Sequence, residues 1–210
     1  EGRRQGYFRG EFFATMRILQ RGDLTQDQLY GSWAGAFGHT QFMPSTYESL
    51  AVDFDGDGRR DLVSSTTDAL ASTANFLKRA GWQTGMPWGF EVKIPDGMSI
   101  SGESRRNKKS LNHWIAQGLT RADGTALIQG NLSGSTLAGL MAPAGSNGPV
   151  FLVFKNFDAI YSYNAAESYG LAIAHLSDRL RGGTPFLTSW PTDDPGPSRA
   201  GRRAIQQFFL

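Results

Sequence analysis

The chain has 210 residues, a formal net charge of +2, 26 glycines and no cysteine, and 12% of its residues are aromatic. This length permits one large domain or two small ones, each with a buried core. The lack of cysteine excludes a disulfide scaffold, a cysteine-ligated metal and a thiol nucleophile, and the small net charge argues against nucleic-acid binding. No apolar run reaches the length of a membrane span.

Three helices are predicted in the first third of the chain. Apolar side chains recur at spacings of three and four over residues 7–20, which indicates a helix that ends at Gly22. Ser45 and Glu48 form a capping-box pattern, which predicts a second helix beginning at Ser45. A stripe of apolar residues over 68–80 predicts a third helix, ended by Gly81.

The middle of the chain changes to a pattern typical of short strands. We predict strands at residues 91–94, 130–132, 137–141 and 150–154, with one helix at 111–117, which together indicate a small α+β insertion. The basic run at residues 105–109 lacks interleaved aromatic residues, and we interpret it as a solvated loop.

Helical spacing returns near the end of the chain. Residues 171–180 predict a helix that ends at Gly182-Gly183, and the proline-rich residues 184–198 predict a linker. Ser198 is a candidate N-cap for a last apolar helix. Because the first residues look like the interior of a domain and this helix stops after a few turns, we expect the chain to be a fragment.

An acidic segment, Asp53-Phe-Asp-Gly-Asp-Gly-Arg-Arg-Asp61, matches the first nine positions of an EF-hand calcium loop. Oxygen ligands are expected from the carboxylates of Asp53, Asp55, Asp57 and Asp61 and from the backbone carbonyl of Arg59. The twelfth position is Ser64 in place of the usual Glu, and Asp68 is the candidate replacement. The alternative is an acidic turn without a bound ion.

The segment GSWAGAFGHTQFMPSTY at residues 31–47 alternates small and large side chains. Small residues allow the backbone to approach a ligand or a neighbouring helix closely. Gln41 is notable in its apolar run, because an amide is costly to bury without partners. Taken alone, Phe42 and Met43 are typical of a core, and Ser32 is equally consistent with a helix cap.

Four segments together resemble one family: the glycine-rich segment at 31–47, AVDFDGDGRRDL, ALASTANFLKRAGW, and YNAAESYGLAIAHLSDRL near the end. They resemble the lytic murein transglycosylase B family of bacterial cell-wall enzymes. The resemblance implies an α+β, mainly α, lysozyme-like fold with an EF-hand-like calcium loop. It implies cleavage of peptidoglycan between N-acetylmuramic acid and N-acetylglucosamine, with a 1,6-anhydro product. The implied domains are a lysozyme-like domain of residues 1–83 and 156–183, an insertion at 84–155, the linker, and the start of a truncated peptidoglycan-binding domain at 199–210.

The resemblance also implies roles for particular residues. Ser32 matches the serine that supports the catalytic carboxylate, and Gln41 matches a glutamine beside the scissile bond. The further implied substrate-binding residues are Arg3, Arg4, Tyr7, Phe42, Met43, Phe76, Tyr163, Asn164 and Tyr169. Phe76 stands where relatives can have Tyr, so a hydroxyl contact is lost there. The family calcium site implies ligands at Asp53, Asp55, Asp57, Arg59 and Asp68, with the loop one residue longer before Asp68 than in the family, and no organic cofactor. Asp61 is a candidate ligand from the EF-hand pattern.

The family's catalytic Glu, which protonates the leaving oxygen, has no match in this sequence, and we expect it upstream of residue 1. Glu1 and Glu11 lie outside the motif, Glu11 on what looks like an ordinary amphipathic helix. The expected partner is the peptidoglycan strand, with no nucleic acid, with membrane association only through an anchor outside this chain, and with a monomer in the periplasm or cell envelope. Two alternatives stay open: a non-catalytic, calcium-stabilised glycan-binding module, and a calcium-binding structural protein without a sugar site.

Overall fold

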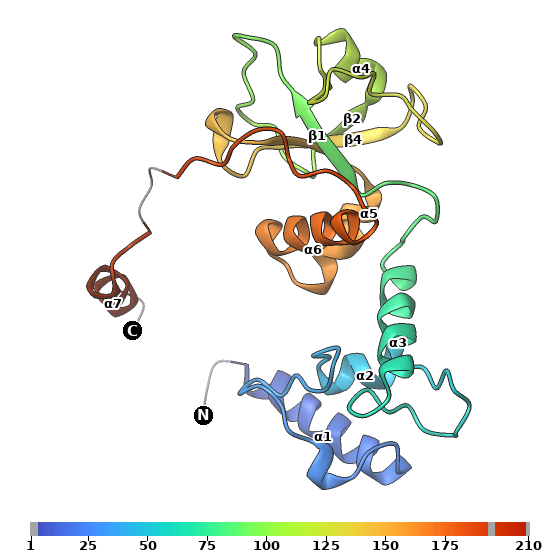
Figure 1. Ribbon diagram of the computed structural model, residues 1–210. Coiled ribbons are helices and arrows are strands. Elements are labelled where there is room, and N and C mark those ends of the chain that lie inside the picture. The colour runs from blue at the N-terminus through green and yellow to red at the C-terminus, as the bar shows by residue number, and fades with distance from the viewer. Residues whose placement is uncertain (1–3, 193–195, 209–210) are drawn as a thin grey trace. The chain divides into compact units, whose positions relative to one another are not determined.

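The computed structural model describes residues 4–192 and 196–208 and contains two compact units, Glu1–Gln83 and Thr84–Leu210 (Figure 1). Each unit buries its own apolar side chains. Residues 156–183, which we grouped with the first 83 residues, lie in the second unit. Their membership of a lysozyme-like domain with residues 1–83 stays a prediction. No helix in the described ranges combines the length and the apolar composition that a membrane crossing needs.

The first unit begins with α1 (Gln5–Arg21), which confirms the first predicted helix. Gly22 ends it in a left-handed conformation and donates its N–H to the carbonyl of Leu19. The buried side chains of α1 are Glu11, Ala14 and Ile18. The more conspicuous apolar set, Phe8, Phe12, Phe13 and Met16, is exposed. The helix was therefore predicted correctly, but the side chains that it buries were not those of its phenylalanine stripe.

The unit continues with a short 3-10 turn, η1 (Gln26–Gln28), then α2 (Pro44–Leu50) and α3 (Thr66–Arg79). The capping box predicted for α2 is wrong, because Met43 is the N-cap and Ser45 lies inside the helix. Glu48 instead pairs with Arg17 of α1. The prediction of α3 is confirmed, with Ser65 as its N-cap.

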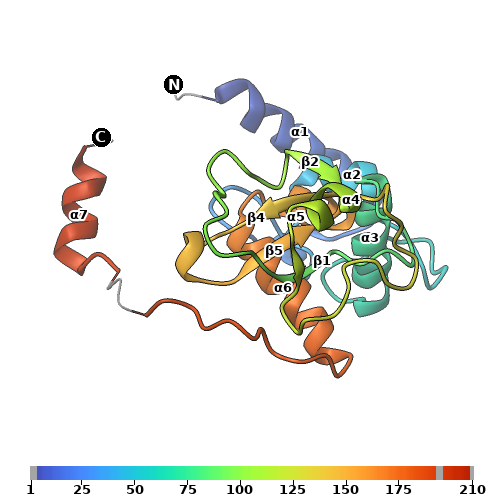
Figure 2. The ribbon, with the colours of Figure 1, turned by 90° about the horizontal axis from the view of Figure 1, so that it is seen from above.

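The second unit contains a five-stranded antiparallel sheet in the order β2-β4-β5-β1-β3. The strands are β1 (Gly89–Lys93), β2 (Lys108–Ser110), β3 (Thr120–Arg121), β4 (Leu137–Met141) and β5 (Val150–Val153), and β4 and β5 lie side by side in Figure 2. Three predicted strands are confirmed as β1, β4 and β5. The strand predicted at 130–132 is wrong, because Leu132 donates its N–H to Gln129 in a turn.

Helices cover both faces of this sheet. Alternate residues of a strand point to opposite faces, so Leu152 packs with Trp114 of α4 (Leu111–Ala116). Phe151 points the other way and contacts Trp88, which contacts Phe157 of α5 (Lys155–Tyr163). The following helix, α6 (Glu167–Leu180), lies with α5 on that side (Figure 1).

The basic run at 105–109 is not the solvated loop that we predicted. Arg105 is only 8% exposed. It pairs with Asp158 at 3.2 Å and with Glu167 at 3.4 Å, and its guanidinium lies 3.5 Å from the ring centroid of Tyr161. The run therefore joins the sheet to α5 and α6, because a buried arginine needs partners from neighbouring elements.

The proline-rich segment packs against the second unit along its first half. The carboxylate of Glu91 accepts the N–H groups of Leu187 and Thr188 at 2.6 and 2.7 Å. The ring of Phe186 stacks on His175 with a centroid distance of 3.8 Å. After residues 193–195, which lie outside the described ranges, Ser198 caps α7 (Arg199–Gln207) as predicted.

Candidate functional site

The glycine-rich segment of the first unit forms a tight, doubly bridged loop. Phe37 pairs with Gly31 on one side and with Phe42 on the other. Ser32 closes the turn, since its N–H donates to the carbonyl of Ala36 at 2.8 Å and its hydroxyl accepts the N–H of Ala36 at 3.1 Å. A Cβ at Gly31 would lie 2.5 Å from the carbonyl oxygen of Ala36. Glycine is therefore required for this backbone contact.

Gln41 stands out in this loop by its conformation and exposure. Its φ is +50°, in the left-handed region that non-glycine residues rarely adopt. Its side-chain amide donates to the carbonyl of Gly38 at 2.8 Å. The neighbouring Phe42 is buried, with its ring 5.8 Å from that of Phe76. The loop thus presents Gln41 outward and anchors itself through Phe42.

The beginning of α1 supplies further predicted site residues. Arg4 precedes the helix, and its guanidinium lies 5.3 Å from the ring centroid of the exposed Tyr7. Partial burial and the neighbouring Glu11 carboxylate raise the pKa of Tyr7 above its ordinary value. Arg3 lies outside the described residues.

Glu11 is a buried carboxylate that sequence reasoning did not select. It is 6% exposed and accepts both the N–H and the hydroxyl of Ser45, at 2.9 and 2.7 Å. The signal that could have identified it is its register with Ala14 and Ile18, which lie three and seven residues later on the buried face.

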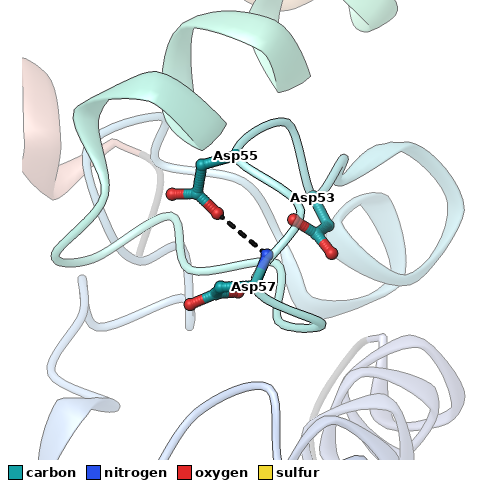
Figure 3. Close-up of side chains that lie close together, drawn as sticks. All are labelled: Asp53, Asp55 and Asp57. Carbon is teal, nitrogen blue, oxygen red and sulfur yellow. Dashed lines mark hydrogen bonds between the residues drawn. The ribbon is translucent and has the colours of Figure 1, made fainter.

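The acidic loop brings together three of its predicted ligands. One carboxylate oxygen each from Asp53, Asp55 and Asp57 lies within 4.8 Å of the others (Figure 3). The glycines in this loop allow its close turns, and Asp53 accepts the N–H groups of Gly56 and Gly58 at 2.7 and 2.9 Å. A set of oxygen donors at this spacing suits a hard cation such as Ca²⁺.

Two other predicted ligands hold the ends of this loop. The buried carboxylate of Asp68 accepts the N–H of Phe54 and the N–H of Asp61, each at 2.9 Å. Asp61 in turn accepts the N–H groups of Val63 and Ser64. Burial disfavours the charge of Asp61, but these N–H groups outweigh it and hold its pKa below the ordinary value. The ligand roles of Asp61, Asp68 and the carbonyl of Arg59 stay predictions.

The guanidinium of Arg59 contacts another part of the first unit. It donates to the carbonyl oxygen of Asp23 at 3.1 Å, and Arg60 pairs with the carboxylate of Asp23 at 2.6 Å. The acidic loop is thereby tied to the segment that follows α1.

The last predicted site residues lie in the second unit, where α5 meets α6. Tyr163 is the last residue of α5, Asn164 is its exposed C-cap, and Tyr169 lies in the first turn of α6. Two half-buried aromatic residues and an exposed amide thus lie close together in sequence, around the connection from α5 to α6. Their contact with substrate stays a prediction.

Comparisons with known proteins place these features in a family. The model of the family described as "Transglycosylase SLT domain" matches residues 1–178. The membrane-bound lytic murein transglycosylase B of Escherichia coli K12 is 35% identical over 186 residues, which are 85% of this chain and 47% of that protein.

Solved structures agree with this relationship. SltB3 of Pseudomonas aeruginosa, in complex with NAG-anhNAM-pentapeptide, superposes with a TM-score of 0.89 at 44% identity and covers 99% of this chain and 55% of its own. The lytic transglycosylase Slt35 of E. coli, in complex with calcium, gives a TM-score of 0.70 at 30% identity over 85% of this chain and 54% of its own. The present chain thus spans about half the length of these relatives.

Proposed function

We propose that this chain, which belongs to the Transglycosylase SLT domain family, is the glycan-binding part of an enzyme that cleaves peptidoglycan strands. The observation that carries the proposal is the family match over residues 1–178, which includes the loop that presents Gln41. The reaction is cleavage of the β-1,4 bond between N-acetylmuramic acid and N-acetylglucosamine, with formation of a 1,6-anhydro ring.

Gln41 and Tyr7 supply the chemistry that this substrate needs in the first unit. An amide and a protonated phenol both donate and accept hydrogen bonds without charge, which suits sugar hydroxyl and acetamido groups. Arg4 adds a cation for the lactyl or peptide carboxylates of peptidoglycan. In the second unit, Tyr163 and Tyr169 are the proposed aromatic surface for a sugar ring.

The proton donor in the proposed reaction is a single carboxylic acid that later accepts the proton of the attacking hydroxyl. Glu11 does not suit this role, because Ser45 occupies both of its oxygens. The proposed catalytic acid is the Glu of the family motif that has no match in residues 1–210. Ser32 is proposed to support the carboxyl group of that Glu. The chain alone is then expected to bind glycan without cutting it.

The acidic loop is the proposed site of one structural Ca²⁺. The support is the cluster of Asp53, Asp55 and Asp57 and the calcium complex of the relative Slt35. The cation would neutralise three close carboxylates and stiffen the loop before α3. Calcium titration of the chain, followed by calorimetry, tests this role, and an absence of binding at millimolar Ca²⁺ would reject it.

The place of action that we propose is the bacterial periplasm or cell envelope, with the chain as a monomer. The support is the substrate itself and the relative that is named membrane-bound. Fractionation of cells, followed by immunodetection, tests it, and recovery in the cytosolic fraction alone would count against it.

Glycan binding by this chain is tested directly by calorimetry with NAG-anhNAM-pentapeptide, the ligand seen with the relative SltB3. We expect saturable binding by the wild type, and binding at least about tenfold weaker for Gln41→Ala, because the amide is lost. Equal affinity of the two proteins would remove Gln41 from the site, and no binding at all would contradict the proposal.

A second candidate is a calcium-stabilised glycan-binding module without catalysis, which the missing match to the catalytic Glu favours. Both candidates predict glycan binding by the chain, so binding does not separate them. They differ in whether the longest polypeptide encoded by the gene releases anhydro-sugar products from peptidoglycan.

A further inference from the structure

Glu11 ties α1 to the start of α2 across 34 residues of sequence. Its Oε2 accepts the N–H of Ser45 at 2.9 Å, and its Oε1 accepts the hydroxyl of Ser45 at 2.7 Å. Both carboxylate oxygens are thus used by one residue. A carboxylate that is 6% exposed is stable only when such donors replace water.

The position of this contact explains why α2 begins where it does. The N-cap residue Met43 has no side-chain oxygen to accept a free N–H of the first turn, and Pro44 has no N–H. The first N–H that needs a partner is that of Ser45, and Glu11 accepts it. A negative charge at this end of the helix also interacts favourably with the helix dipole. Glu11 therefore acts as the N-cap from another helix.

The residues just before α2 are the ones proposed to bind substrate. Gln41 has φ +50°, and a strained conformation of this kind persists only when the surrounding structure holds it. On its N-terminal side the loop is held because Phe37 donates its N–H to Phe42. Four residues after Gln41, Ser45 makes two tertiary hydrogen bonds to Glu11.

We infer that Glu11 is a positioning residue, which through Ser45 holds the backbone of the loop that carries Gln41 in the arrangement that binds the glycan. This inference rests on the proposed function for its role in binding. It does not make Glu11 a catalytic residue, because Glu11 acts through Ser45.

The test compares Glu11→Gln and Glu11→Ala with a matched control, Glu48→Gln. Glu48 also joins α1 to α2, through two hydrogen bonds from Arg17 at 2.7 and 2.8 Å, but it lies at the far end of α2 from Gln41. Calorimetry with NAG-anhNAM-pentapeptide gives the affinity, and urea unfolding gives the folded fraction under the same conditions. If at least about 95% of each variant is folded, unfolding lowers the apparent affinity by only about 5%, so a larger loss reports weaker binding.

The three variants should differ in their affinity for the glycan. Glu11→Ala weakens binding at least about tenfold, because binding must then supply the free energy of ordering the loop that the hydrogen bonds to Ser45 supplied. Glu11→Gln weakens it less, because the amide keeps the shape and one acceptor, and Glu48→Gln changes it less than about twofold. Equal affinities of Glu11→Ala and Glu48→Gln would overturn the inference.

Hydrogen exchange of the backbone amides makes the test independent of any ligand. In Glu11→Ala, the amides of Gln41 and Ser45 should exchange at least about tenfold faster, while the amides of α3 keep their rates. If the wild type binds no glycan, the proposed function fails, and this exchange pattern still decides whether Glu11 holds the loop. Unchanged exchange at Gln41 and Ser45 would refute the positioning role.

Discussion

Substitution of Asp68 by Asn separates two roles that this residue can have in the acidic loop. In the structure its two oxygens accept the N–H groups of Phe54 and Asp61, both at 2.9 Å, and its side chain is buried. We therefore expect Asp68 to close the loop whether or not calcium is bound. A metal ligand, in contrast, would affect stability only when calcium is present.

The magnitude follows from the two hydrogen bonds. In Asp68→Asn an NH2 group replaces one carboxylate oxygen. This group is a donor, so it cannot accept the backbone N–H that the oxygen accepted. One hydrogen bond to a charged group is lost, which is worth about 1.5–3 kcal/mol. We expect the free energy of unfolding to fall by about 2–3 kcal/mol.

The assay is urea unfolding followed by circular dichroism, in EDTA and again in Ca²⁺. The matched control is Asp55→Asn, an exposed member of the carboxylate cluster. In EDTA this control should change stability by less than about 0.5 kcal/mol, whereas it should weaken calcium binding at least about tenfold. The reasoning is refuted if Asp68→Asn is neutral in EDTA and loses stability only in Ca²⁺.

Three further predictions concern other parts of the chain. Arg105→Met should lower the free energy of unfolding by about 2 kcal/mol in urea titration, because Asp158 loses one charged hydrogen-bond donor and keeps only its pair with Lys108. The exposed Lys93→Met should cost less than about 0.5 kcal/mol, and equal effects would contradict a stabilising Arg105–Asp158 pair. The pKa of Asp61 is lower in the folded protein than in the unfolded chain. The Asp61 carboxylate therefore contributes fully to stability above about pH 4, the pKa of an unfolded Asp, and this contribution is lost as the pH falls through the lower pKa of the folded state. Asp61→Asn should therefore flatten the acid limb of a plot of stability against pH, and an unchanged limb would oppose this. Gln41→Gly should be about 1 kcal/mol more stable than Gln41→Ala, because only glycine adopts φ +50° without strain, and thermal melts that rank them in the reverse order would exclude strain at this position.

Local sequence patterns predicted the helices and strands well where neighbouring residues alone determine the element. The spacing of apolar residues and the terminal Gly22 were sufficient for α1, and Ser198 was sufficient for the start of α7. The acidic loop was also found from sequence, because aspartates at alternate positions in a glycine-containing turn bring their carboxylates close together.

Tertiary contacts account for the predictions that failed. The Ser45–Glu48 pattern did not form a capping box because Glu11 caps α2 from α1 and Arg17 holds Glu48. Both contacts join residues more than thirty positions apart, which no local pattern reveals. Arg105 was similarly read as solvated, since its partners Asp158 and Glu167 lie on helices far along the chain.

The candidate site was predictable only in part for the same reason. Gln41 could be selected from its polar character in an apolar run and from the family resemblance. Its left-handed backbone and the role of Glu11 depend on how the loop returns to α1. The residues proposed to touch a substrate are thus more visible in sequence than the residue proposed to hold them in place.

The most direct test of the central claim is mass spectrometry of the products released from purified peptidoglycan by the longest polypeptide that the gene encodes. The account predicts muropeptides that end in 1,6-anhydro-N-acetylmuramic acid, with at least about tenfold less product from Gln41→Ala. The 210-residue chain alone should bind peptidoglycan and release none. Products with a reducing muramic acid end, or no release by the longer polypeptide, would contradict the claim.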